Sequence, residues 1–288
     1  MTVAAPAYVP RKKPLSLSRV TTYAVLIGGA VLMIYPLLWM LMSSIKSDSE
    51  IFSNPAALPT HLDLGNYITG WFATSPSFTQ YYINSFMICL GAVIGNVLAC
   101  SLTAYAFARL DFPFKRSLFT IMLLTLMLPS HVLLIPQYVM FARMGWVNTY
   151  LPLIVPKFLA TDAFFIFLMV QFIRRIPRDL DEAATLDGCS TFRIFTSIIF
   201  PLLQPALITT IIFTFIWTYN DFFPQLIYLT SPESLTVPVG LRTLVDSSGG
   251  AYGQLLAMSA LSLIPTFIVF LIFQRRLVEG IATSGLKG

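Results

Sequence analysis

The stretch that decides the fold runs from residue 174 to residue 205 and reads RRIPRDLDEAATLDGCSTFRIFTSIIFPLLQP. It is the longest polar-rich interruption between apolar runs in the second half of the chain. Pro177 can occupy a first helical turn, and the acidic residues that follow it suit the positive end of a helix. Gly188 can adopt the left-handed conformation that closes a helix. The stretch therefore predicts a first short helix that ends at Gly188.

A second helix is predicted directly after this turn. Ser190 or Thr191 can cap it by accepting a backbone hydrogen bond. Pro201 and Pro205 lack the backbone N–H that a helix interior uses, so they are expected to end it. Helical spacing places four apolar residues on one side of this helix: Phe192, Phe195, Ile198 and Ile199. A two-helix loop with such a face needs a surface against which it can dock.

The composition is that of an integral membrane protein. Hydrophobic residues make up 56% of the chain and charged residues 11%, whereas about a quarter of the residues in soluble domains are charged. A helix needs about 20 mostly apolar residues to cross a bilayer. The runs that meet this need are Thr22–Met42, Asn84–Phe107, Leu118–Val139, Leu151–Phe172, Ala206–Tyr228 and Gln254–Phe273. We therefore expect an all-α membrane protein with six transmembrane helices and a two-helix loop between the fourth and the fifth.

The positions of the cations predict the orientation, because cytoplasmic segments of membrane proteins are enriched in Lys and Arg. With the N-terminus in the cytoplasm, the spans and the outer side keep only Lys46, Arg143, Lys157 and Arg242. Both termini and the loop 174–205 are thus expected in the cytoplasm. The expected divisions are a flexible cytoplasmic leader (1–21), a transmembrane domain (22–274) and a cytoplasmic tail (275–288). The net charge of +5 reflects this topology and gives no reason to expect nucleic-acid binding.

The loop resembles the EAA signature of bacterial ABC-importer permeases. The residues that match are Glu182, Ala183, Ala184, Gly188, Ile198 and Pro201. The family usually has Leu before the final Pro, where this chain has Phe200, so an apolar residue is retained. The resemblance implies that the loop couples the permease to a separate cytoplasmic ATPase. The coupling residues that it implies are Glu182, Ala183, Ala184, Leu186, Asp187, Gly188, Ile198 and Pro201.

The resemblance spans nearly all of the chain after the leader and is closest to the maltose-type carbohydrate branch. Residues 104–113 and 273–280 are also family-like. It implies a permease subunit of a binding-protein-dependent sugar importer in the lipid of the bacterial inner membrane. The implied partners are a second homologous permease, two ATPase subunits and an extracytoplasmic solute-binding protein, which the loop 230–253 would contact. ATP and Mg²⁺ would act at the ATPase, and this chain would bind no cofactor or metal of its own.

Candidate residues for the solute pathway lie in the fourth and fifth apolar runs. The fifth run supplies Trp217, Tyr219, Asn220 and Asp221, in a region where sugar-importer permeases commonly have a Trp and an Asn-Asp pair. An aromatic surface beside amide and carboxylate groups suits a hydroxylated solute, although an interfacial aromatic girdle explains the same residues equally well. Asp162 is a further candidate, because a charge at membrane depth usually faces a bundle interior or water. For Lys157, snorkelling of the side chain to the outer interface is the preferred explanation.

Other activities lack the residues that they need. The chain has no GxxxxGK[ST] phosphate-binding loop, no HExxH and no GxSxG, so it is not expected to be an ATPase or a hydrolase. His61 and His131 are isolated from one another, which leaves no metal ligand set. The remaining alternative is a proton- or ion-coupled secondary transporter. Such a protein would pair ionisable groups near the midplane, whereas Asp162 and Asp221 have no obvious cationic partner in the sequence.

Overall fold

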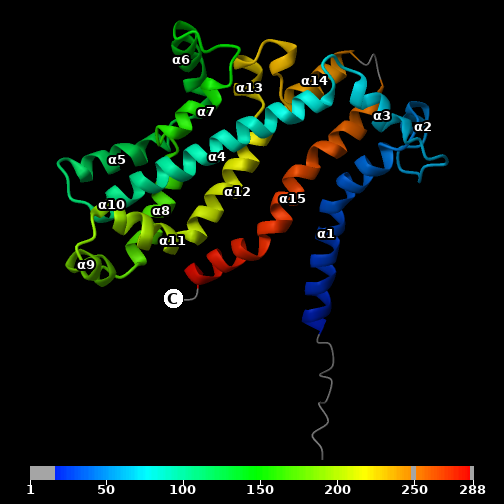
Figure 1. Cartoon of the computed structure of the whole chain (residues 1–288). Helices are drawn as coiled ribbons and strands as arrows, with labels where there is room; N and C mark the ends of the chain where they lie inside the picture. Colours follow the sequence, from blue (N-terminus) through cyan, green and yellow to red (C-terminus); the bar gives the residue numbers. More distant parts are fainter. Residues whose placement is uncertain (1–16, 248–250, 286–288) are drawn as a thin grey trace, which may run out of the picture.

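The computed structural model describes residues 17–247 and 251–285. Residues 1–16 of the expected leader, 248–250 of the last loop and 286–288 of the expected tail lie outside the described residues. All regular structure within the described ranges is helical (Figure 1). The helices of the first half are α1 Leu17–Ser43, α2 Asp48–Ser53, α3 Gly65–Phe72, α4 Phe78–Arg109, α5 Lys115–Thr125 and α6 Ser130–Arg143. Those of the second half are α7 Leu151–Phe158, α8 Ala163–Arg175, α9 Asp179–Leu186, α10 Thr191–Ile194, π-helix η1 Phe195–Ile199, α11 Phe200–Leu202, α12 Gln204–Asn220, α13 Phe223–Tyr228, 3₁₀-helix η2 Pro232–Ser234, α14 Val237–Ser247 and α15 Tyr252–Gly285.

Helix α4 is the axis of the bundle and contacts α7, α8, α12 and α14. Its small residues set how closely α7 approaches. A Cβ atom added at Gly91 would lie 2.9 Å from Cγ2 of Ile154, and one added at Gly95 would lie 3.0 Å from the backbone carbonyl carbon of Lys157. The two glycines form a small-xxx-small pair that lets α4 and α7 approach closely, because neither position has room for a side chain.

Four described helical segments are long and apolar enough to cross a membrane, rather than the expected six. They are Thr21–Ser43, Phe78–Arg109, Leu151–Arg175 and Tyr252–Gln274. A fifth is obtained if Thr191–Leu202 and Gln204–Asn220, which meet at 75°, are taken together as one bent span. The all-helical membrane architecture is therefore confirmed, while the count of continuous spans is lower than the apolar runs predicted.

The run Leu118–Val139, expected as the third span, is not one helix. It is divided between α5 and α6, with residues 126–129 between them. Pro129 has no N–H to donate to the carbonyl of Thr125, and it disfavours the helical conformation at Leu128. The proline breaks this run as its chemistry requires. The fifth run is divided in a similar way, because α12 ends at Asn220 and the short α13 follows.

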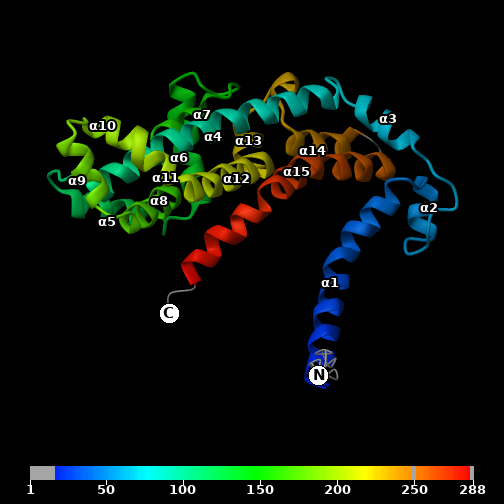
Figure 2. The same ribbon diagram turned by 60° about the horizontal axis from the view of Figure 1, so that its bottom comes forward.

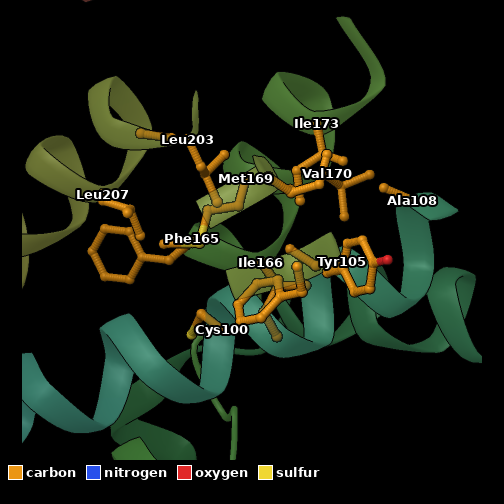
Figure 3. Close-up of a cluster of buried hydrophobic side chains, with 14 of the residues drawn as sticks. Cys100, Tyr105, Ala108, Phe165, Ile166, Met169, Val170, Ile173, Leu203 and Leu207 are labelled. Carbon is orange, nitrogen blue, oxygen red and sulfur yellow. The ribbon is translucent and has the colours of Figure 1, made fainter. Parts of the chain in front are cut away.

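Two groups of buried side chains hold the bundle together, one toward each end of α4. The group near α9 and α10 joins α4 and α8 to the two-helix loop and to the start of α12, and Figure 3 shows its side chains converging between these helices. The other group joins α4 to α7, α13, α14 and α15. Figures 1 and 2 both show α9 and α10 at one end of α4 and α3 and α14 toward the other. The loop is thus fixed to the bundle by its own core.

The two-helix loop begins as the sequence predicts. Helix α9 covers Asp179–Leu186, and Gly188 has a φ of +79°, the left-handed conformation expected at the turn. Ser190 caps the second helix, because its side chain accepts a hydrogen bond from the backbone N–H of Arg193 at 3.4 Å. These three local predictions rest on backbone chemistry, and each is confirmed.

The second helix departs from the prediction at Pro201, which does not end it. The helix runs from Thr191 to Leu202, and the 75° bend follows at Leu203. The segment before Pro201 is a π-helix, in which the N–H of Phe200 bonds to the carbonyl of Phe195, five residues earlier. This wider turn lets the chain pass through a residue that cannot donate a hydrogen bond.

The predicted apolar face of the second helix is also wrong in one residue. Phe195 and Ile199 are buried and Ile198 is half-buried, whereas Phe192 is 66% exposed. Ile194 takes the buried place instead. Since the wide turn of η1 changes the angular spacing of side chains, the spacing of a regular α-helix misplaces Phe192.

Helix α1 stands apart from the rest of the bundle. Figures 1 and 2 show it diverging from α15, the long helix with which it is in contact. None of the most apolar part of α1 is buried within the chain. A helix that is apolar all round and uncovered by protein must be covered by lipid or by another subunit.

Replacing Gly95 by Ala is expected to destabilise the protein, because the added methyl group would push α7 away from α4. Overpacking of this kind costs about 1–3 kcal/mol. Gly29→Ala is the matched control, since a Cβ at Gly29 has no neighbour within 4 Å. The midpoint of thermal unfolding in detergent should fall for Gly95→Ala and stay at or slightly above the wild-type value for Gly29→Ala. Equal midpoints for both variants would contradict the close contact.

Candidate functional site

The two-helix loop is attached to the end of α4 by polar contacts as well as by its core. Nε of Arg109 lies 2.6 Å from Oδ2 of Asp181, in an ion pair whose side chains are 7% and 19% exposed. The same guanidinium donates from Nη2 to the carbonyl oxygen of Ile176 at 2.6 Å. The hydroxyl of Tyr105 donates to the carbonyl oxygen of Thr191 at 3.3 Å. One helix of the bundle therefore holds the start of the loop, α9 and the start of α10 in fixed positions.

The residues expected to couple to an ATPase divide into exposed and buried positions. Ala184 is buried against the bundle and Ile198 is half-buried. The exposed members are Glu182, Ala183, Leu186, Asp187, Gly188 and Pro201. Leu186 is 90% exposed, and with Phe192 it gives the loop two large apolar side chains that face away from its own core. A hollow of about 470 Å³ lies beside them, between the end of α4 and the loop.

A second polar site lies inside the bundle, at the break between α7 and α8. Nζ of Lys157, at the end of α7, lies 2.8 Å from Oδ2 of Asp162, which immediately precedes α8. Nδ2 of Asn96 in α4 lies 2.5 Å from the same oxygen and 3.0 Å from Oγ1 of Thr214. The carboxylate also sits at the N-terminal, positive end of α8.

This geometry corrects two sequence-based predictions. Asp162 does have a cationic partner, and Lys157 points to that partner, so snorkelling does not explain it. The two residues are only five apart, but Ala160 between them has a φ of +55°. That left-handed residue turns the chain at the break and brings the two side chains together. A continuous helix would have placed them on different faces.

The Lys157–Asp162 pair lies in the wall of a cavity of about 530 Å³. Three helix breaks meet there: those between α5 and α6, between α7 and α8, and between α12 and α13. A smaller cavity of about 250 Å³ shares Leu153, Lys157, Trp217 and Asp221 with it. Ligand cavities of this size, with a few polar groups among apolar and aromatic ones, are typical of small-molecule sites.

Three of the five candidate pathway residues line this cavity, namely Trp217, Asp221 and Asp162. The other two do not. Tyr219 is 2% exposed and its ring stacks on Phe215 at 5.7 Å, inside the protein core. Asn220 is exposed and donates to the carbonyl oxygen of Ile216, its own helix neighbour, at 2.8 Å. The position of consecutive residues around α12 explains the division, because a helix turns about 100° per residue.

The structure adds polar cavity residues that were not chosen as pathway candidates. They are His131 and Gln137 of α6, Lys157 of α7 and Thr161 at the break. Prolines 129 and 156 mark two of the breaks in the sequence, and side chains near a broken membrane helix tend to face protein or water. The two prolines could have pointed to these polar residues from the sequence alone. Only the tertiary structure shows that three separate helix breaks meet at one cavity.

Comparison with known proteins identifies the family. Residues 91–283 match the family model for the binding-protein-dependent transport system inner membrane component. The chain is 32% identical over 262 residues to the arabinooligosaccharides transport system permease protein AraQ of Halalkalibacterium halodurans, covering 90% of this chain and 93% of that protein. It is 34% identical over 269 residues to the trehalose/maltose transport system permease protein MalG of Thermococcus litoralis, covering 91% and 96%.

A solved structure has the same fold. It is the crystal structure of a bacterial ABC transporter involved in the import of the acidic polysaccharide alginate. One of its chains superposes with a TM-score of 0.79 at 23% identity, covering 93% of this chain and 99% of that one. At this identity the likeness establishes the architecture alone. Together with the family match, it shows that this chain belongs to the inner membrane permease components of binding-protein-dependent transport systems.

Proposed function

We propose that this chain is a permease subunit of an ATP-driven sugar importer and forms half of the translocation pathway. The sugar class is supported by the relatives, which are named for the transport of arabinooligosaccharides, galactooligosaccharides and trehalose or maltose. The partners proposed are a second homologous permease, two ATPase subunits that bind ATP and Mg²⁺, and an extracytoplasmic solute-binding protein. A solved complex of an alginate transporter with its solute-bound periplasmic protein has the same fold, with a TM-score of 0.61.

The proposed topology has six membrane crossings, with both termini and the loop 174–205 in the cytoplasm. Three of these crossings would not be single continuous helices, namely α5 with α6, α7 with α8, and the region of α12 with α13. In both Figure 1 and Figure 2, helix α9 and the last described turns of α15 lie away from α3 and α14, which supports a common side for α9 and the end of α15. The positive-inside distribution of Lys and Arg supports the cytoplasm as that side.

The loop 174–205 is proposed as the coupling element that docks on the ATPase. The observation that supports this best is the combination of a rigid attachment and an exposed apolar tip. The Arg109–Asp181 ion pair holds α9 to α4, while Leu186 and Phe192 remain 90% and 66% exposed. Since α10, η1 and α11 lead without a gap to the bend before α12, a movement of the loop would be transmitted to the bundle as a rigid-body motion.

The cavity is proposed as the surface with which this subunit contacts the solute, through Trp217, Asp221 and the group around Asp162. An ion-coupled carrier would also use paired charges such as Lys157 and Asp162. Membership in a binding-protein-dependent family favours ATP-driven import over that alternative. The Lys157–Asp162 pair is then a support for the break in the fourth span rather than an ion-coupling site.

The coupling role predicts which proteins purify with this chain. Tagged wild-type protein, extracted from its own host in mild detergent, should bring down an ATPase and a second permease, as identified by mass spectrometry. Glu182→Lys, which reverses a charge at an exposed position of α9, should lose most of the ATPase and keep the second permease. Asp111→Lys is the matched control, because Asp111 is a fully exposed acidic residue just after α4, with its side chain 93% exposed. Recovery of the chain alone under several detergents would overturn the proposed function.

Gly188→Val should uncouple ATP hydrolysis from transport, because Val is strained at the φ of +79° that the turn requires. No atom lies within 4 Å of the added Cβ, so the effect is one of backbone conformation alone. Gly188→Asn is the matched control, since Asn tolerates the left-handed region. The number of solute molecules imported per ATP should fall several-fold for Val and stay near the wild-type value for Asn. A normal ratio in a fully assembled Val variant would contradict the coupling role.

A further inference from the structure

Among the described residues, four side chains that line the cavity carry or can acquire a charge. The charged residues are Lys157, Asp162 and Asp221, and His131 adds a positive charge only when it is protonated. Every cation that this chain offers to a solute inside the cavity is therefore either Lys157 or a protonated His131. The balance among these four groups determines which charge on a solute the cavity can accept.

The positive charge of Lys157 is already neutralised within the wall. Its Nζ lies 2.8 Å from Oδ2 of Asp162, and Asn96 donates to the same oxygen. Both side chains of the pair are more than two-thirds covered, so water screens their attraction less than at a surface. Lys157 has further N–H donors, but a carboxylate on a solute would meet a positive charge that Asp162 already balances.

Once Lys157 is paired with Asp162, Asp221 is the remaining charged residue of the cavity lining. No salt bridge joins it to a cation among the residues that the structure describes. It lines both the larger cavity and the smaller one, as do Lys157 and Trp217. With His131 neutral and both carboxylates ionised, the two carboxylates and one ammonium group give this chain's lining a formal charge of −1. An enclosed cleft with one excess charge concentrates ions of the opposite sign and repels those of its own.

The uncharged part of the lining suits hydroxyl groups. Gln137 and Thr161 offer hydrogen-bond donors and acceptors. Trp217 is 51% exposed, although Phe164, Phe165 and Phe213 surround it at ring-centre distances of 5.4–5.7 Å. The rings fix the indole in place and leave part of its surface free for the apolar side of a sugar.

From this balance, and on the basis of the proposed sugar-importer function, we propose that the cavity admits uncharged or amino-bearing sugars and excludes sugars that carry a carboxylate. Lys157 and Asp162 act as a neutral pair in the wall, and Asp221 is the residue that makes the net charge of the cavity negative. The solved relative that imports alginate handles an acidic polysaccharide, so the shared fold does not settle the charge class of the solute. The lining of this chain's own cavity supports the proposed charge class for the half of the pathway that this subunit forms.

The test measures the sign of the net charge in the cavity, using charged thiol reagents on the assembled complex. The native cysteines Cys89, Cys100 and Cys189 are first replaced by Ala, Ala and Ser. Thr161→Cys then places one thiol in the cavity, and Ala73→Cys places one at an exposed position between α3 and α4, a stretch without charged residues. The probes are a trimethylammonium-ethyl and a sulfonatoethyl methanethiosulfonate. Rates are measured at pH 8, where imidazole is largely neutral, with and without ATP and vanadate.

After division by the rates at Ala73→Cys, the cationic reagent should modify Thr161→Cys at least about tenfold faster than the anionic reagent. Adding Asp221→Asn should bring this ratio close to one, while Glu233→Gln, which removes an exposed acid outside the cavity, should leave it unchanged. If Asp221→Asn does not assemble, the ratio with Asp221 present still decides the matter. A ratio of one or less with Asp221 present overturns the proposal, and so does a thiol at 161 that reacts with neither reagent in either nucleotide state.

The outcome is separable from that of the proposed function. In one outcome, the complex contains the ATPase and the second permease while the anionic reagent reacts as fast as the cationic one. That result would support the importer function and contradict the charge selection. Purification of the chain without an ATPase would contradict the importer function, whatever the rates of thiol modification show.

Discussion

The contact between Asn96 and Asp162 determines how the rest of the bundle can be arranged. The expected fourth span is broken between α7 and α8, and a break inside a membrane leaves backbone groups and charges that lipid cannot satisfy. Asp162 meets three needs at once, because it lies at the start of α8, pairs with Lys157 at the end of α7 and accepts a hydrogen bond from the central helix. The glycines of α4 then allow α7 to lie against the same helix. The hydrogen bond from Asn96 and the space left by the glycines of α4 together hold the broken span in place.

The same helix connects the two sites that the structure presents. Its first half borders the core that includes Tyr219 and α14, and its middle supplies Asn96. Its last turns hold α10 through Tyr105 and α9 through Arg109. A displacement of the two-helix loop would therefore act directly on the element that supports the cavity wall. No chain of intermediate contacts is needed, since one rigid helix of 32 residues spans the distance.

Local chemistry made much of the fold predictable from the sequence. The turn at Gly188 and the cap at Ser190 each depend on one residue type in one backbone role. The features that escaped prediction depend on structure that regular spacing does not include. Lys157 meets Asp162 only because Ala160 turns the chain between them, and Pro201 lies within a helix only because a π-turn precedes it. Counting apolar residues likewise could not reveal that proline divides the third run into two helices.

Helix α1 has a consequence for how this protein can change over time. Its apolar surface packs on little of the chain apart from α15, so almost any lipophilic side chain serves equally well at most of its positions. Selection there acts on hydropathy and length rather than on shape. Where lipid covers α1, its sequence is therefore freer to drift than that of the bundle around α4. The anchor can be exchanged between related proteins, whereas the helices that hold the cavity and the loop must evolve together.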